Sequence, residues 1–174
     1  SEQLDELWVP TSYVQECYIR SGLPAELVQV IPNGIDTTLF RPDAPSVTLP
    51  TSKKWKFLYV GSTTLDRKGF DILIDAYIRE FSNLDDVTLV VKDMAVYTGG
   101  HNPVANQLRE LAKKPGVPEI LFIGQDLSGD QLAGIYTACD CLVHAYRGEG
   151  FGLPIAEAMS SGLPVIVTGH GAAL

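Results

Sequence analysis

The sequence predicts an α/β domain in which a parallel β-sheet is flanked by helices. Short apolar runs rich in valine, isoleucine and leucine alternate along the chain with segments whose apolar residues recur at helical spacing, and this alternation is typical of parallel sheets. The chain has 174 residues, of which 45% are hydrophobic, so it has the length of one domain and can bury a sizeable core. We find no internal repeat and no low-complexity tract.

The first third of the chain predicts a β-α-β unit followed by a connector. Residues 7–9 form a short strand candidate, residues 13–20 a capped helix that ends at Gly22, and residues 28–31 a second strand. Residues 43–54 are rich in proline, serine, threonine and lysine, which indicates a surface connector.

The remainder of the chain predicts five further strands with helices between them. The strands are expected at 56–61, 87–92, 119–124, 141–145 and 165–168. Apolar residues at helical spacing indicate helices at 70–81 and 104–114. A third helix, with Ser128 as a plausible N-cap, runs towards Asp140, and a fourth begins at Pro154 and ends before Gly162.

Composition excludes several classes of function. The net charge of −8 argues against a general nucleic-acid surface, and no apolar run approaches the ~20 residues that cross a bilayer. The three cysteines lack metal-ligand spacing, and His101, His144 and His170 form no recognisable ligand pattern. If Cys139 belongs to the following strand, it shares one face with Cys141; if it closes the preceding helix, no geometry follows. We expect small buried thiols in a reducing compartment, a cytoplasmic location and no metal.

A glycine-flanked turn between the strand at 141–145 and the last helix is the strongest candidate for a binding site. Such a turn presents unpaired backbone N–H groups at the positive end of a helix dipole, and these groups suit phosphate or sugar hydroxyls. Gly150 and Gly152 let a ligand approach the backbone, and Glu149 and Glu157 bracket the turn. Because a carboxylate repels phosphate, the glutamates fit neutral hydroxyls better, which together suggests a sugar nucleotide. The alternative is that a glutamate here merely complements the helix dipole.

The segment E-G-F-G-L-P-I-A-E-A-M at 149–159, followed by S-G-L-P-V-I at 161–166, resembles the E-x7-E signature of the retaining GT-B glycosyltransferases of family 4. Similar elements of that family appear in P-N-G-I-D at 32–36 with F-R-P at 40–42, and in Lys68-Gly69. The resemblance implies a Rossmann-like sheet that forms the C-terminal half of a GT-B fold. Residues 1–174 would be the nucleotide-sugar-binding domain, a truncated fragment without the N-terminal acceptor domain and inactive by itself.

The resemblance also implies roles for individual residues. Lys68 and Glu149 would be catalytic, with Lys68 neutralising charge on the leaving diphosphate. Glu157 would hold the ribose hydroxyls. The further donor-binding residues would be Gly61, Ser62, Arg67, Gly150, Phe151, Gly152 and Leu153. The resemblance implies no metal and no cofactor, and the nucleoside-diphosphate sugar would be a substrate. The acceptor is unknown. Contact with a membrane surface would come only through the absent domain.

Two departures from the family pattern keep other functions open. Ser62 stands where the family has an arginine that holds the donor diphosphate, so either Arg67 substitutes for it or activity is altered. The family's glycine-rich turn after the strand at 87–92 is replaced by Lys92-Asp93-Met94, to which no role is assigned. A non-catalytic nucleotide- or protein-binding module therefore stays an alternative to a glycosyltransferase that moves a hexosyl group. A sugar-nucleotide 2-epimerase is a second alternative, because it shares the fold and a similar donor site.

Overall fold

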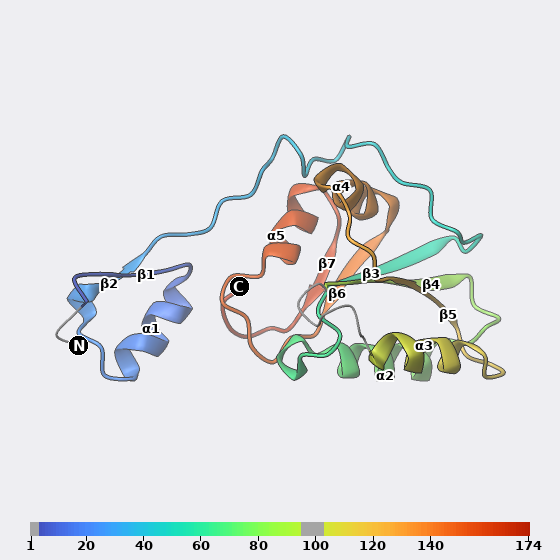
Figure 1. Cartoon of the computed structure of the whole chain (residues 1–174), viewed down its shortest axis with the longest axis horizontal. Coiled ribbons are helices and arrows are strands. Elements are labelled where there is room, and N and C mark those ends of the chain that lie inside the picture. The colour runs from blue at the N-terminus through green and yellow to red at the C-terminus, as the bar shows by residue number, and fades with distance from the viewer. Residues whose placement is uncertain (1–3, 95–102) are drawn as a thin grey trace.

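The computed structural model describes residues 4–94 and 103–174 and contains two separate parallel sheets in these ranges (Figure 1). The smaller sheet pairs β1 (Leu7–Val9) with β2 (Val28–Val30), which are joined through α1 (Ser12–Arg20) and a 3₁₀ turn at Ala25–Leu27. The prediction of parallel strands flanked by helices is confirmed. The alternation of elements did not distinguish one sheet from two, because local patterns do not specify which strands pair.

The larger sheet has five parallel strands in the order β5-β4-β3-β6-β7. Their bounds are β3 Trp55–Gly61, β4 Val87–Asp93, β5 Glu119–Ile123, β6 Cys141–His144 and β7 Val165–Val167. The chain runs outward from β3 to β5 and then returns to the other side of β3 with β6. The strand order therefore reverses between β3 and β6.

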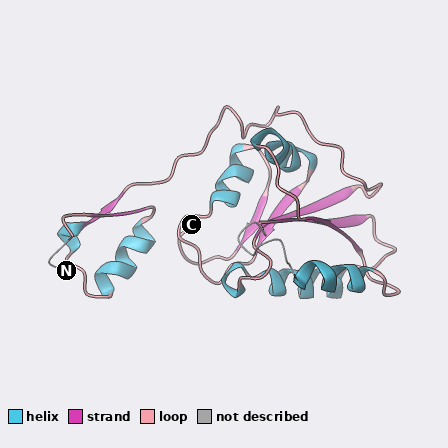
Figure 2. Ribbon diagram, viewed as in Figure 1, coloured by secondary structure: helices cyan, strands magenta, loops and turns pink. Residues whose placement is uncertain are grey.

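Helices cover both faces of the larger sheet (Figures 1 and 2). They are α2 (Phe70–Glu80) and α3 (Pro103–Ala112) on one face, and α4 (Gly129–Ala138) and α5 (Leu153–Ser160) on the other. Each face has its own hydrophobic cluster, and the alternation along β4 divides the strand between them. Leu89 and Val91 pack with α2 and α3, whereas Val90 packs with α4 and α5.

Local sequence sets the ends of the helices. Ser128 is the N-cap of α4 as predicted, and it forms a capping box in which its Oγ accepts from the Gln131 N–H and the Gln131 side chain accepts from the Ser128 N–H. Pro154 is the second residue of α5, one position later than predicted, and Gly162 follows the C-cap with φ +74°. Cys139 is the C-cap of α4, so it does not belong to the strand and shares no strand face with Cys141.

The connector between the two sheets packs more closely than a surface connector. Phe40 and Ala44 are buried, and Val47, inside the predicted surface segment, donates its backbone N–H to the carbonyl of Gly134 on α4 at 3.1 Å. A Cβ on Gly134 would lie 2.8 Å from the Pro45 carbonyl oxygen, so glycine permits this close approach. The prediction that 43–54 lies on the surface was wrong for Ala44, which is buried, and for Val47, which is partly buried, because this part of the connector packs on α4.

Candidate functional site

Two loops meet at the carboxyl ends of β3 and β6, where the strand order reverses. Residues 62–69 follow β3 and residues 145–152 follow β6. The backbone N–H of Arg147 donates to the Arg67 carbonyl at 2.8 Å and ties the two loops together. Open parallel sheets bind ligands at such a reversal of strand order, because the loops diverge there and leave a crevice. Most of the predicted site residues lie on these two loops or directly after them: Ser62, Arg67 and Lys68 on the first, and residues 149–153 on the second and at the start of α5.

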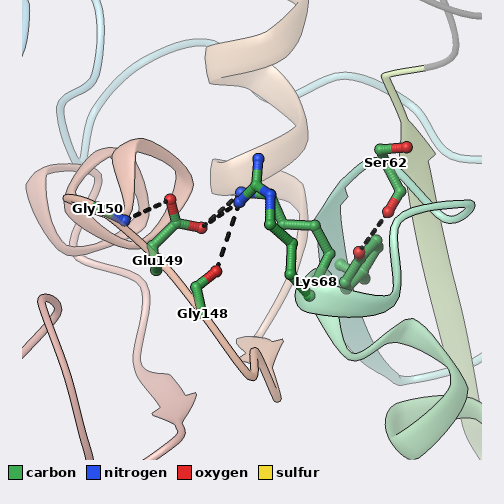
Figure 3. A network of polar contacts seen from close by, with 7 residues as sticks. Ser62, Lys68, Gly148, Glu149 and Gly150 are labelled. Atoms are coloured by element: carbon green, nitrogen blue, oxygen red, sulfur yellow. Dashed lines mark hydrogen bonds and ion pairs between the residues drawn. The ribbon is translucent and has the colours of Figure 1, made fainter.

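Lys68 and Glu149, the two predicted catalytic residues, form an ion pair across the two loops. The Lys68 Nζ lies 2.5 Å from the Glu149 Oε2, and the side chains are 12% and 11% exposed (Figure 3). Burial raises the pKa of Glu149, but the hydrogen bond and charge of Lys68 outweigh it and hold this pKa below its usual value. The carboxylate is therefore ionised at neutral pH. The ammonium group has three donors, so Lys68 can contact a second anion while it keeps Glu149.

The turn that follows Glu149 leads directly into α5. Gly152 adopts the left-handed conformation, with φ +89°, immediately before Leu153, and no side chain in the described part of the protein caps the helix. The positive end of the α5 dipole therefore faces the loop. The Gly150 N–H donates to the Glu149 Oε1 at 3.2 Å, so the turn and the ion pair are one connected structure (Figure 3).

Glu157 lies one turn into α5, where its carboxylate is half-buried. Its Oε2 accepts a hydrogen bond from the hydroxyl of Tyr136 on α4 at 2.7 Å. Burial raises the pKa of Glu157, and the hydrogen bond from Tyr136 partly opposes that effect. The sequence motif placed Glu157 correctly on the helix after the glycine turn, but it did not reveal the partner on the neighbouring helix.

Ser62 and Arg67 lie on the loop after β3 and differ in what they bring to the site. Ser62 accepts a hydrogen bond at its carbonyl from the Tyr59 hydroxyl at 3.0 Å (Figure 3), and its side chain supplies no charge. The Arg67 Nη1 lies 3.4 Å from the Gly148 carbonyl oxygen and 3.9 Å from the Glu149 Oε2. A guanidinium therefore lies beside the Lys68–Glu149 pair, although it comes from a position five residues after Ser62.

A pocket of about 400 Å³ separates the smaller sheet from α5. Its lining comes from residues of the β1–α1 turn and β2 and from the α5 region, including Phe151 and Gly152 of the predicted donor site. The Thr11 hydroxyl donates to the Gly150 carbonyl at 3.2 Å, and Tyr13 contacts His170, so the β-α-β unit reaches the glycine turn. Lys68, Glu149 and Glu157 do not line this pocket.

Asp93 belongs to the segment Lys92-Asp93-Met94, to which the sequence assigned no role, and in the structure it has a structural one. It ends β4, is 1% exposed, and accepts a hydrogen bond from the Thr63 N–H at 2.8 Å. Asp93 therefore holds the start of the loop that carries Lys68. His101, for which the sequence indicated no ligand role, lies outside the described residues.

His144 is a buried group of the site that sequence reasoning missed. It ends β6 with no exposed surface, and its ring stacks on Tyr59 with centroids 5.4 Å apart. Neither ring nitrogen has a hydrogen-bond partner among the described residues. A Cβ on Gly61 would lie 3.6 Å from its Nε2. Burial, followed by the positive charge of Lys68, lowers the pKa of His144 to about 4. The one available signal was a histidine within an otherwise apolar strand.

The buried neutral ring predicts a pH-dependent stability. The fold holds the pKa of His144 at about 4 rather than 6.5, so between these pH values the unfolded chain binds a proton that the folded chain does not. The contribution of the neutral His144 ring to the free energy of unfolding is therefore complete above pH 6.5 and is lost as the pH falls from 6.5 to about 4. We expect urea unfolding to show a loss of about 3 kcal/mol over this range that His144→Leu removes. His170→Leu, which replaces an exposed histidine, should keep the pH dependence of the unmodified chain. An equally steep dependence in His144→Leu would contradict this account.

The described residues contain no group of three or more histidine, cysteine, aspartate or glutamate side chains that could hold a metal ion. In the same part of the chain, no helix combines the length and the apolar character needed to cross a membrane. All three cysteines are free thiols, with Cys17 exposed, Cys139 buried and Cys141 intermediate.

Comparisons with known proteins identify the family. The family model described as glycosyl transferases group 1 matches residues 54–174. The lipopolysaccharide core biosynthesis mannosyltransferase LpsB of Rhizobium meliloti is 33% identical over 148 residues, which cover 82% of this chain and 41% of the relative. The chain therefore spans less than half the length of that relative.

Solved structures show the same fold. The Anabaena protein HepE in complex with UDP-glucose matches with a TM-score of 0.74 and 23% identity, over 97% of this chain and 46% of that one. The C-terminal domain of the group 1 glycosyltransferase LpcC from Francisella tularensis matches with a TM-score of 0.56 and 26% identity, over 80% of this chain and 73% of that one. The expected C-terminal half of a GT-B fold is confirmed, and the chain belongs to the group 1 glycosyltransferases.

Proposed function

We propose that this chain binds the nucleoside-diphosphate sugar donor of a family 4 retaining glycosyltransferase that transfers a hexosyl group to an unknown acceptor. The observation that carries the proposal is the Lys68–Glu149 pair, which lies beside the glycine turn at the reversal of strand order. A cation and a helix N-terminus together suit a diphosphate, and a neighbouring carboxylate suits sugar hydroxyls. The HepE structure with UDP-glucose supports this class of ligand.

Most of the predicted site residues then have a role. Lys68, with Arg67 in place of the missing family arginine, neutralises charge that develops on the leaving diphosphate. Glu149 and the backbone of residues 150–153 hold the donor sugar and the phosphates, and Glu157 accepts hydrogen bonds from the ribose. The proposed reaction uses no metal and no cofactor besides the donor. The free thiols support a cytoplasmic location, because free thiols persist in reducing compartments.

We further propose that residues 1–174 transfer no sugar by themselves and depend on an N-terminal domain for the acceptor. The chain covers less than half of relatives such as LpsB, which supports this division of labour. Transfer of sugar by the 174-residue chain alone would contradict it.

Calorimetric titration with UDP, GDP and ADP, each with and without its sugar, tests the proposed donor site. We expect saturable binding of one diphosphate, and we expect Glu157→Ala to weaken it by about tenfold, because a ribose contact to a charged group is lost. Glu110→Ala, which removes an exposed carboxylate from α3, is the control and should bind as tightly as the unmodified chain. Failure of all three nucleotides to bind would overturn the proposal.

Ser62 favours a second candidate, a non-catalytic nucleotide-binding module, because it brings no charge to the position of the family arginine. Turnover by the full-length protein that is lost on replacing Glu149 or Lys68 would exclude this candidate. A sugar-nucleotide 2-epimerase is distinguished by product analysis, since it would change the donor sugar and transfer nothing.

A further inference from the structure

Tyr136 connects the core of the domain to the proposed ribose ligand. Its side chain on α4 has no exposed surface, and its hydroxyl donates to the Glu157 Oε2 at 2.7 Å. The ring packs edge-on against Phe40 of the connector, with centroids 5.7 Å apart, and the Phe40 carbonyl accepts a hydrogen bond from Ser160 of α5. Because α4, α5 and the connector all enclose the ring, its hydroxyl has one fixed position.

A fixed donor at one carboxylate oxygen restricts how Glu157 can point. Glutamate has three rotatable side-chain bonds and loses conformational freedom when it binds a ligand, so a carboxylate that is already held binds more tightly. A carboxylate also offers about four lone-pair sites, so the bond from Tyr136 leaves acceptor capacity for hydroxyl groups.

We propose that Tyr136 is a positioning residue that orients Glu157 toward the ribose diol and thereby sets the preference of this site for ribonucleotides over deoxyribonucleotides. The inference rests on the proposed function, because it concerns the same donor site. Beyond that function, the inference assigns Tyr136 as the residue that orients Glu157, and it assigns the ribose as the part of the nucleotide that Tyr136 and Glu157 select.

The test compares two variants in which a buried tyrosine ring loses its hydroxyl and the hydrogen bond that the hydroxyl donates. Tyr136→Phe removes the donor to Glu157, whereas Tyr77→Phe removes a donor to the Glu119 carbonyl at 2.9 Å within the hydrophobic cluster on the opposite face of the sheet. Both substitutions keep the buried ring, so we expect a similar modest loss of thermal stability. That shared loss controls for a merely structural effect.

Each variant is titrated with UDP, GDP and ADP and with their 2′,3′-dideoxy analogues. We expect the unmodified chain to prefer the ribonucleotide, and we expect Tyr136→Phe to lower this preference by about tenfold, as for a hydrogen bond to a charged group. Affinity for the dideoxy analogue should stay unchanged in Tyr136→Phe, and Tyr77→Phe should keep both affinities. Glu157→Ala should abolish the preference, and Tyr136→Phe should have no further effect on it in that background.

A second measurement needs no nucleotide. The hydrogen bond from Tyr136 lowers the pKa of Glu157 against the effect of burial, so NMR titration of the Glu157 carboxyl should give a higher pKa in Tyr136→Phe and an unchanged one in Tyr77→Phe. An unchanged ribose preference in Tyr136→Phe, with Glu157→Ala still impaired, would overturn this inference alone. No binding of any nucleotide by the unmodified chain would overturn the proposed function and this inference with it.

Discussion

Replacing Lys68 with methionine is expected to weaken nucleoside-diphosphate binding by about 100-fold. The substitution removes the cation that we propose for the diphosphate and leaves the ionised Glu149, whose side chain is 11% exposed, without its close partner. The carboxylate, left without its cation, also repels the phosphates of the ligand, which lowers the affinity further. Breaking the buried pair separately costs about 3–5 kcal/mol of folding stability. Arg67 is 3.9 Å from Glu149 and 54% exposed, so it compensates only in part. Calorimetry on this chain measures the affinity.

Lys113→Met is the matched control for Lys68→Met. Lys113 directly follows α3 and forms an ion pair of nearly the same length with Glu110, at 2.6 Å, but both side chains are 70% exposed. Exposed pairs contribute about 0–1 kcal/mol, so the control should bind nucleotide as tightly as the unmodified chain. If Lys68→Met also bound with unchanged affinity, Lys68 could not be the ligand of the diphosphate.

Gly69→Ala is expected to destabilise the fold by at least about 4 kcal/mol. Gly69 has φ +63°, and a Cβ at this position would lie 1.8 Å from the backbone oxygen of Ala145. Neither atom can move by itself, because Gly69 is the N-cap of α2 and Ala145 directly follows β6. The two loops of the site would have to separate, and with them the Lys68–Glu149 pair. Urea unfolding followed by circular dichroism measures the free energy of unfolding.

Gly116→Ala separates backbone strain from the clash. Gly116 also has a positive φ, +82°, but a Cβ there would meet no atom within 4 Å. Its substitution should lower the free energy of unfolding by only about 1–2 kcal/mol, because alanine is strained in the left-handed conformation. Equal losses in Gly69→Ala and Gly116→Ala would mean that the close approach between the two loops contributes nothing.

The sequence by itself determined most of the elements. Periodicity in 70–81 and the capping residue Ser128 are local properties, so they predicted α2 and the start of α4 without knowledge of the fold. The apolar run at 141–145 predicted the strand, and the residues from Gly150 to Gly162 predicted the glycine turn and the helix that place Glu149 and Glu157. The resemblance in the same residues led to a glycosyltransferase, and the comparisons show the group 1 family.

Tertiary structure alone decided how these elements combine. Lys68 and Glu149 are 81 residues apart, and they meet because β6 returns to the edge of β3 rather than continuing beyond β5. Tyr136 and Glu157 meet because α4 and α5 cover the same face of the sheet, and His144 is buried because it packs against Tyr59 and Gly61. These contacts depend on strand pairing and on packing between distant segments, which no local pattern of residues encodes.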